Sequence, residues 1–165
     1  MSEVTARLGP GKVLPGGDPD FTVGRGWYDP SERVLLLVHR IGDAWHRNRG
    51  LRGAPPVLMA TLAAGNHLQA YLRAYKLNVA DLERPRLSPT SLRGPNGIRL
   101  RDSRATAFRA LGASEFHERR GALESYSYFN LRPDVRRAGC GEAGFIMTIT
   151  FTNGTLTRVE ILEAS

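Results

Sequence analysis

The sequence predicts an α+β fold in which N-terminal helices pack on a C-terminal antiparallel sheet that ends in a β-hairpin. Two patterns predict this fold. Apolar residues recur at spacings of three and four through much of residues 34–111, as amphipathic helices require. Within residues 125–162, apolar and polar side chains instead tend to alternate, as they do in strands. Asn153-Gly154 can fill the two positive-φ positions of a type I′ hairpin turn.

Length and composition favour one domain preceded by a loose segment. The chain has 165 residues, of which 41% are hydrophobic and 24% are charged, so it can bury one sizeable core. Residues 1–30 hold six glycines and four prolines, which indicates an extended arm rather than packed secondary structure. We therefore predict a flexible arm over residues 1–28 and a single α+β domain over residues 29–165.

The first helix is expected to begin at Asp29. Asp29, Pro30 and Glu32 supply an N-cap carboxylate, a proline at the first helical position and a glutamate three residues after the cap. An apolar stripe follows at helical spacing, and the helix is predicted to end near Asn48. The stripe consists of Val34, Leu37, Val38, Ile41 and Trp45.

Two more helices are predicted in the centre of the chain. Pro55-Pro56 is expected to open a second helix whose apolar stripe runs from Leu58 to Tyr75. Asn78–Asp81 can cap a short third helix, which Pro85 ends.

A loop over residues 85–97 leads to a short predicted strand, Ile98–Arg101. Asp102 or Ser103 is then expected to cap a fourth helix, and Gly112 is well placed to end it.

The C-terminal hairpin is the firmest prediction. Phe145–Thr152 and Thr155–Leu162 are its expected strands, and Ser125–Leu131 is expected to be another strand of the same sheet. A two-residue loop sets Thr152 opposite Thr155. If that register continues, Ile149 faces Arg158 and Met147 faces Glu160.

Positive charge is concentrated in the middle of the chain. The formal net charge is +7, and residues 33–137 carry 19 basic and 8 acidic groups. Arginine accounts for 21 of the 23 basic residues, which suits bidentate phosphate contacts, although codon bias in a GC-rich genome also produces an arginine preference. Such a region attracts phosphate, an anionic membrane surface or an acidic protein.

Nine arginines are the candidate nucleic-acid-binding residues. Six surround the proline- and glycine-containing loop, and three repeat every seven residues along the first predicted helix, with His39 and His46 beside them. A solvated basic surface is the alternative interpretation. The nine are Arg84, Arg86, Arg93, Arg99, Arg101, Arg104, Arg33, Arg40 and Arg47.

We therefore expect a non-enzymatic protein that binds nucleic acid, RNA in particular, and self-associates. A structural or assembly role, such as that of a virus coat or matrix protein, fits a small basic chain with an acidic arm. Trp27 and Tyr28 would anchor this arm on a neighbouring copy. An adaptor that binds an acidic partner protein is a further alternative.

The first alternative, ahead of the adaptor, is a small α+β enzyme that acts on a small molecule or on RNA. His117, Glu118, Arg119 and Arg120 bring together the residue types that a metal-independent ribonuclease requires, although neighbours in a strand face opposite sides. The order of helices and sheet also resembles the cone-shaped folds of the nuclear-transport-factor-2 and ketosteroid-isomerase kind. That resemblance implies a pocket between helices and sheet, with the candidates Tyr126, Tyr128, Arg158 and Glu160.

The remaining signals are absences. His39 and His46 lie seven residues apart, and no histidine or cysteine spacing indicates a metal site or another cofactor. Cys140 has no partner for a disulfide. Neither a secretory signal nor a membrane-spanning run is evident, so an intracellular, cytoplasmic protein is expected.

Overall fold

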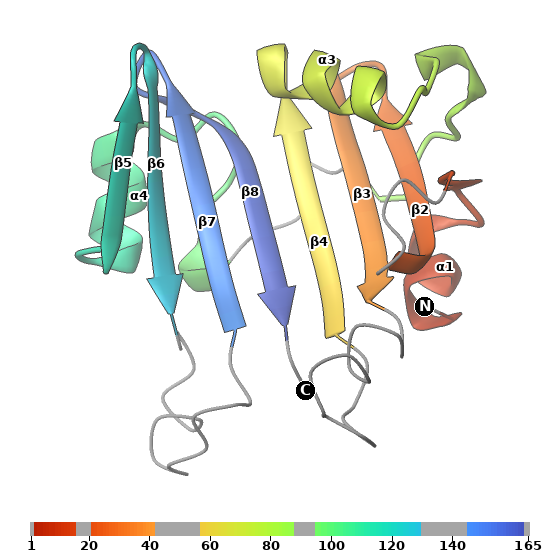
Figure 1. Cartoon of the computed structure of the whole chain (residues 1–165), viewed down its shortest axis with the longest axis horizontal. Coiled ribbons are helices and arrows are strands. Elements are labelled where there is room, and N and C mark those ends of the chain that lie inside the picture. The colour runs from red at the N-terminus through yellow and green to blue at the C-terminus, as the bar shows by residue number, and fades with distance from the viewer. Residues whose placement is uncertain (1, 16–20, 42–56, 88–94, 130–144, 164–165) are drawn as a thin grey trace, which may run out of the picture.

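A computed structural model describes residues 2–15, 21–41, 57–87, 95–129 and 145–163. These residues form one antiparallel sheet of eight strands in the order β1-β2-β3-β4-β8-β7-β6-β5 (Figure 1). The strands are β1 (Lys12–Val13), β2 (Phe21–Asp29), β3 (Val34–Ile41), β4 (Val57–Ala64), β5 (Phe116–Arg120), β6 (Leu123–Phe129), β7 (Phe145–Thr152) and β8 (Thr155–Glu163).

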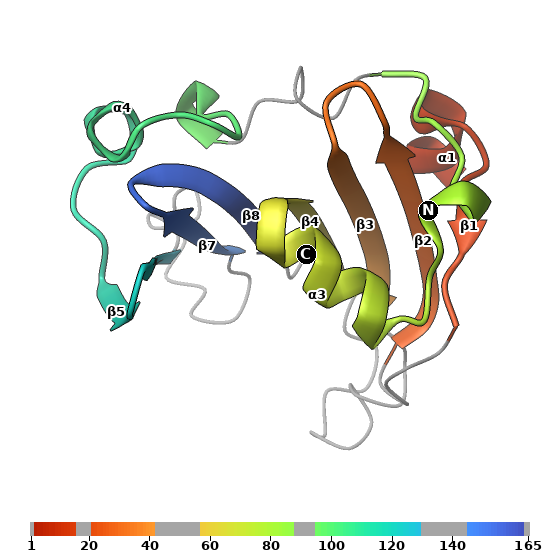
Figure 2. The same cartoon turned by 90° about the horizontal axis from the view of Figure 1, so that it is seen from above.

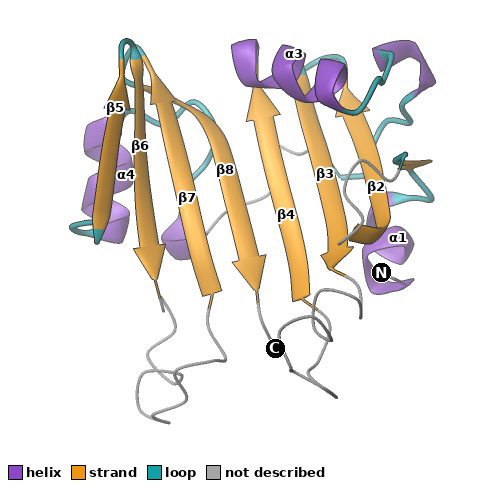
Figure 3. Cartoon of the chain, in the orientation of Figure 1, coloured by secondary structure: helices purple, strands orange, loops and turns teal. Residues whose placement is uncertain are grey.

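The described helices are short and lie around the sheet (Figure 3). Three are α-helices: α1 (Ser2–Leu8), α3 (Gly65–Ala74) and α4 (Arg104–Leu111). Two single turns, η1 (Val79–Asp81) and η3 (Pro95–Gly97), are 3₁₀ helices. The predicted fold of N-terminal helices on a C-terminal sheet is therefore wrong, because both the N-terminal and the C-terminal parts of the chain contribute strands to the one sheet.

The main error concerns the helix predicted from Asp29. The Asp29 carboxylate does accept hydrogen bonds from the backbone N–H groups of Ser31 and Glu32, but it closes the turn between β2 and β3. The following residues are buried on both sides of the sheet, with Val34 and Leu36 facing one side and Leu35 and Leu37 the other. A continuous apolar run of this kind fits a doubly covered strand as well as it fits a helix.

The segment predicted as the second helix is divided between two elements. Residues 57–64 form β4, which pairs with β3 and β8 in the centre of the sheet. Only Gly65–Ala74 is helical. Ile98–Arg101 is not a strand either, because the chain there leaves η3 and turns into α4, with Ile98 and Leu100 buried beneath it.

The described part of the N-terminal region is packed, contrary to the expected extended arm. Leu8 of α1 and Trp27 of β2 are buried in one apolar cluster with Leu36 and Val38 of β3. Gly11 lies against the Trp27 ring, which leaves no space for a side chain. Glycine is therefore needed here for a close approach, and it does not indicate an unpacked arm.

Several predictions are confirmed. Ser103 caps α4 through its side chain and Gly112 follows the last helical residue, while Asn78 caps η1. β7 and β8 form the expected hairpin with Thr152 opposite Thr155. Beyond the turn the register differs, because Phe151 pairs with Leu156 and Thr150 pairs with Arg158.

This register shift is a β-bulge that leaves Thr157 as an extra residue on β8. Ile149 consequently faces Val159, and Met147 faces Ile161, rather than Arg158 and Glu160. The bulge sends the apolar residues of β8 to the same side as those of β7. It also moves Arg158 and Glu160 together to the opposite side.

The two sides of the sheet carry different layers (Figure 2). We call the side covered by α1 and α4 the α1–α4 face, and it contains the largest apolar cluster, including Met147, Ile149 and Phe151. The other side is the α3 face, where Leu68 and Leu72 of α3 pack on Leu35 and Leu37. Among the described residues, no helix is long and apolar enough to cross a membrane.

Candidate functional site

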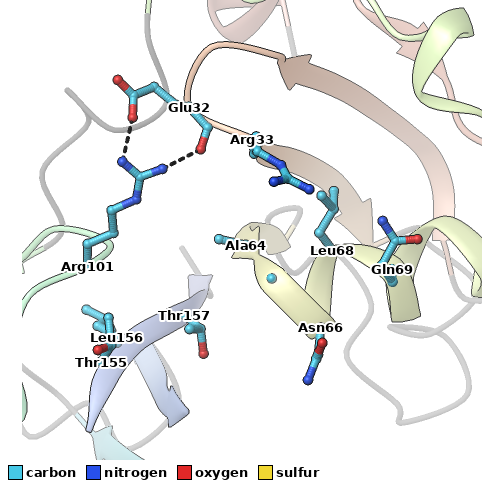
Figure 4. A pocket seen from close by; sticks show the side chains of 11 residues that line it. Glu32, Arg33, Ala64, Asn66, Leu68, Gln69, Arg101, Thr155, Leu156 and Thr157 are labelled. Carbon is cyan, nitrogen blue, oxygen red and sulfur yellow. Dashed lines mark hydrogen bonds and ion pairs between the residues drawn. The ribbon is translucent and has the colours of Figure 1, made fainter. Parts of the chain in front are cut away.

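A cavity of about 570 Å³ opens where the β2–β3 turn, the start of α3 and the start of β8 meet (Figure 4). This volume falls within the range of small-molecule sites. We call it the upper pocket. Its lining residues are Glu32, Arg33, Ala64, Gly65, Asn66, Leu68, Gln69, Arg101, Thr155, Leu156 and Thr157.

Backbone pairing places two arginines at this pocket. Arg33 is the last residue of the β2–β3 turn, and Arg101 lies just before α4. The Arg101 N–H donates to the carbonyl of Leu156 at 2.8 Å, and the Leu156 N–H donates to the carbonyl of Asp102 at 2.9 Å. These bonds hold the Arg101 segment beside the first residues of β8.

Both pocket arginines have an unusual backbone conformation. Arg33 has φ 54° and Arg101 has φ 74°, in the left-handed region that favours glycine. A residue with a β-carbon is held there at a cost of about 1 kcal/mol or more. Such costs concentrate at binding and catalytic sites, where the side chain itself is required.

Glu32 partly neutralises the pocket. The Arg101 guanidinium donates to the Glu32 carboxylate at 2.9 Å and to the Glu32 carbonyl at 2.6 Å. Arg33 forms no ion pair with another described residue, so the lining carries two positive charges against one negative charge. The carboxylate therefore competes with any external anion for Arg101.

The N-terminus of α3 adds to the positive potential. Ala64 makes no side-chain cap and the first turn contains no acidic residue. The first N–H groups of a helix lack partners within the helix and carry a partial positive charge. Together with Arg33 and Arg101 they form surroundings suited to an anion.

The other predicted arginines are dispersed. Arg84 pairs with the buried Asp29 carboxylate at 3.7 Å and bonds Ser31, and Arg104 pairs with Glu124 at 2.6 Å. The pKa of Asp29 is lowered, chiefly by the hydrogen bond from the Ser31 hydroxyl, while burial acts in the opposite direction. The backbone N–H groups of Glu32 and Ser31 and the charge of Arg84 lower the pKa further. Both guanidinium groups are therefore already engaged by acids of the chain.

Arg86 and Arg99 do not line the upper pocket. Arg86 lies against α1, where its side chain donates to the carbonyl of Ala6 at 3.5 Å. Arg99 is exposed in the segment before α4. Arg47 and Arg93 lie outside the described residues.

The predicted stripe of arginines every seven residues is wrong for Arg33 and Arg40. Arg33 immediately precedes strand β3 and Arg40 belongs to it. Seven residues of extended strand place the two about 23 Å apart, so they do not share one helix face. His39 is likewise on β3 and is buried beneath α3, where its ring stacks on Tyr75 at 5.3 Å.

Comparison with protein-family models, curated proteins and solved structures gives no match.

The candidate ribonuclease residues lie on the edge strand β5 and are divided between its two faces. His117 stacks on Tyr126 at 4.4 Å on the α1–α4 face. Glu118 faces the other side and pairs with Arg120 at 2.6 Å. The acid and the base therefore do not meet at one position, as the strand geometry predicts.

The candidates for a pocket between helices and sheet are also divided. Tyr126 and Tyr128 are buried on the α1–α4 face, whereas Arg158 and Glu160 lie on the α3 face. On that face Glu160 accepts a hydrogen bond from Tyr71 of α3 at 3.0 Å. Sequence reasoning missed Tyr71, because no spacing links a helix residue to a strand 89 positions later.

Metal chemistry receives no support from the described residues. In this part of the chain, no three histidine, cysteine, aspartate or glutamate side chains lie close enough together to hold a metal ion. Cys140 lies outside it.

Proposed function

We propose that the protein binds nucleic acid, single-stranded RNA in particular, by holding a phosphate in the upper pocket. The observation that carries the proposal is the convergence of Arg33, Arg101 and the uncapped start of α3 on one cavity. Guanidinium groups and helix N-termini are the groups that bind phosphate most effectively in proteins. The net charge of +7 supplies the long-range attraction that brings a polyanion to the molecule.

The polar residues of the upper pocket support a nucleic acid over a bare anion. Thr155, Thr157, Asn66 and Gln69 add hydroxyl and amide groups around the cationic residues. Groups of this kind hydrogen-bond the sugar and phosphate oxygens of a nucleic acid, including the 2′-hydroxyl of RNA.

The test compares two glycine variants. Arg33→Gly removes the pocket charge at a position whose φ of 54° favours glycine, so the variant stays folded. Lys76→Gly removes the same charge at φ 53° beyond the other end of α3 and is the matched control. Binding of a labelled single-stranded RNA is measured by fluorescence anisotropy over a range of salt concentrations.

Arg33→Gly is expected to weaken RNA binding about tenfold and to lower the salt slope by about one unit, because one phosphate contact is lost. Lys76→Gly should leave both nearly unchanged. Equal losses in the two variants would show that binding follows net charge alone. Binding to anionic vesicles but not to RNA would contradict the choice of nucleic acid.

Glu32→Gln provides a second test in the opposite direction. The substitution frees the Arg101 guanidinium and leaves two positive charges without a competing carboxylate. RNA affinity should rise a few-fold in the same anisotropy assay. Unchanged or weaker binding would argue against a phosphate at this pocket.

A further inference from the structure

A polar cluster lies on the α3 face beside the upper pocket. Its members are Tyr71 of α3, Arg158 and Glu160 of β8, and the neighbouring Thr61 of β4 and Thr150 of β7; we call it the Tyr71–Glu160 cluster. Arg158 and Glu160 are two residues apart on one strand, so their side chains emerge on the same face. Both are partly exposed.

Hydrogen bonds orient the two charged groups. Tyr71 donates its hydroxyl to Oε2 of Glu160 at 3.0 Å, and Nε of Arg158 donates to the Thr150 hydroxyl at 3.2 Å. The Thr150 hydroxyl is in turn 3.0 Å from that of Ser125. Burial, followed by the Glu160 charge, raises the pKa of Tyr71 to about 12, so the phenol remains a donor at neutral pH.

The cluster retains hydrogen-bonding capacity. Thr61 is directly opposite Glu160 in the β4–β8 ladder and is only 1% exposed, yet its hydroxyl makes no hydrogen bond within the described part of the chain. A buried polar group without a partner is costly unless a ligand or water satisfies it. The Glu160 carboxylate also has a second oxygen besides the one that accepts from Tyr71.

The cluster adjoins the upper pocket along both β8 and α3. Thr157 of the pocket immediately precedes Arg158, and Asn66 of the pocket immediately precedes His67. The pKa of His67 is lowered by burial and by the nearby charge of Arg158. Along β8, Thr157 and Glu160 are separated by about 10 Å, and along α3, Asn66 and Tyr71 by about 8 Å. This is the scale of one nucleotide from its phosphate to its base.

We propose that the Tyr71–Glu160 cluster recognises the guanine base of a nucleotide whose phosphate lies in the upper pocket. The inference rests on the proposed phosphate site and names the base that accompanies it. Guanine presents N–H donors at N1 and N2 and acceptors at O6 and N7. Glu160 accepts from the donor edge, and Arg158 donates to the acceptor edge. Adenine has no pair of adjacent donors for the carboxylate.

The experiment measures binding of 5′-GMP, 5′-IMP, 5′-AMP and inorganic phosphate to the full chain by calorimetry at low salt. GMP is expected to bind at least about fivefold more tightly than AMP, since one bidentate base contact has that effect. IMP lacks only the N2 amino group and should fall between them. This ligand series requires no variant, so it remains decisive if a substitution disturbs folding.

Variants separate this inference from the proposed function. Glu160→Gln should reduce GMP affinity to the AMP level, whereas Glu118→Gln, on the same face at the sheet edge, should not. Arg33→Gly should weaken all the phosphate ligands equally. Equal GMP and AMP affinities, both lowered by Arg33→Gly, would overturn guanine recognition alone. Affinities that are the same in the unaltered protein and in Arg33→Gly would overturn the phosphate site as well.

Discussion

Trp27 shows how a single residue organises the N-terminal part of the fold. Its indole is fully buried between α1 and the sheet, and Gly11 lies against its edge. Gly11 also has a positive φ of 63°, and its N–H donates to the Glu83 carboxylate at 3.2 Å. Both the close approach and the backbone conformation require glycine at this position.

Gly11→Ala should therefore lower the free energy of unfolding more than the same change at a glycine with a similar φ. Gly121 has φ 61° and open space around its α-carbon, so Gly121→Ala measures the backbone cost alone, about 1 kcal/mol. The alanine at Gly11 must also displace the Trp27 ring, which adds about 2 kcal/mol. Urea unfolding curves measure both, and equal losses would contradict the packing role.

At the scale of elements, the contact between α3 and the sheet contains two histidines that favour the neutral form. Burial lowers the pKa of His39, while the charge of Glu160 raises it to a smaller extent. Burial and the Arg158 charge both lower the pKa of His67. Tyr71 of α3 also faces Glu160, and its raised pKa of about 12 keeps it neutral in this pH range.

Acid should therefore destabilise the protein as the pH falls from about 6.5 to about 5.5. Above the unfolded pKa of 6.5 both imidazoles are neutral in both states and the stability is fully present. Below it the unfolded chain binds more protons, so stability is lost as the pH falls. The melting temperature should drop by several degrees over this interval and by less in His39→Gln. A constant melting temperature would contradict the assignment.

At the scale of the whole molecule, the N-terminal region is part of the packed fold, so deleting it tests folding and not only self-association. Residues 2–14 and 21–28 contribute α1, β1 and most of β2, and they cover one side and one edge of the apolar strand β3. Trp27 is buried within its own chain and is not available as an anchor on a neighbour. Self-association and an assembly role, as in a virus coat or matrix protein, remain predictions that need another surface.

Deleting residues 1–28 should unfold or aggregate the protein instead of only reducing its oligomer size. The deletion exposes the buried side chains of Leu36 and Val38 and removes β2, one of the two strands that hydrogen-bond β3. Circular dichroism and light scattering of the truncated and full chains provide the measurement. A truncated chain with the full-length melting temperature would restore the arm interpretation. The light-scattering mass of the full chain tests self-association directly.

The predictions that succeeded depend on short segments. The Asn153-Gly154 turn and the Ser103 cap are each defined within four residues, and both form as predicted because their hydrogen bonds are local. The prediction at Asp29 failed although its local hydrogen bonds do form. The same carboxylate contacts begin a helix or close a turn, and the burial of β3 on both faces decides between them.

The candidate site could be predicted only in part. A surplus of arginine was evident, but which arginines remain for a ligand depends on distant acids, as with Arg84 and Asp29 or Arg104 and Glu124. Arg33 and Arg101 meet through the pairing of the Arg101 segment with β8. No spacing in the chain encodes that pairing.

The sequence by itself determined the net positive charge, which is a sum over its residues. It also determined the local geometry of the turns and caps and the C-terminal hairpin, because interactions between near neighbours specify them. Tertiary structure decided that residues 34–41 and 57–64 are central strands, since only layers on both faces make their apolar runs favourable. It also decided the bulge at Thr157. That one extra residue places Arg158 and Glu160 on the α3 face, where α3 supplies Tyr71.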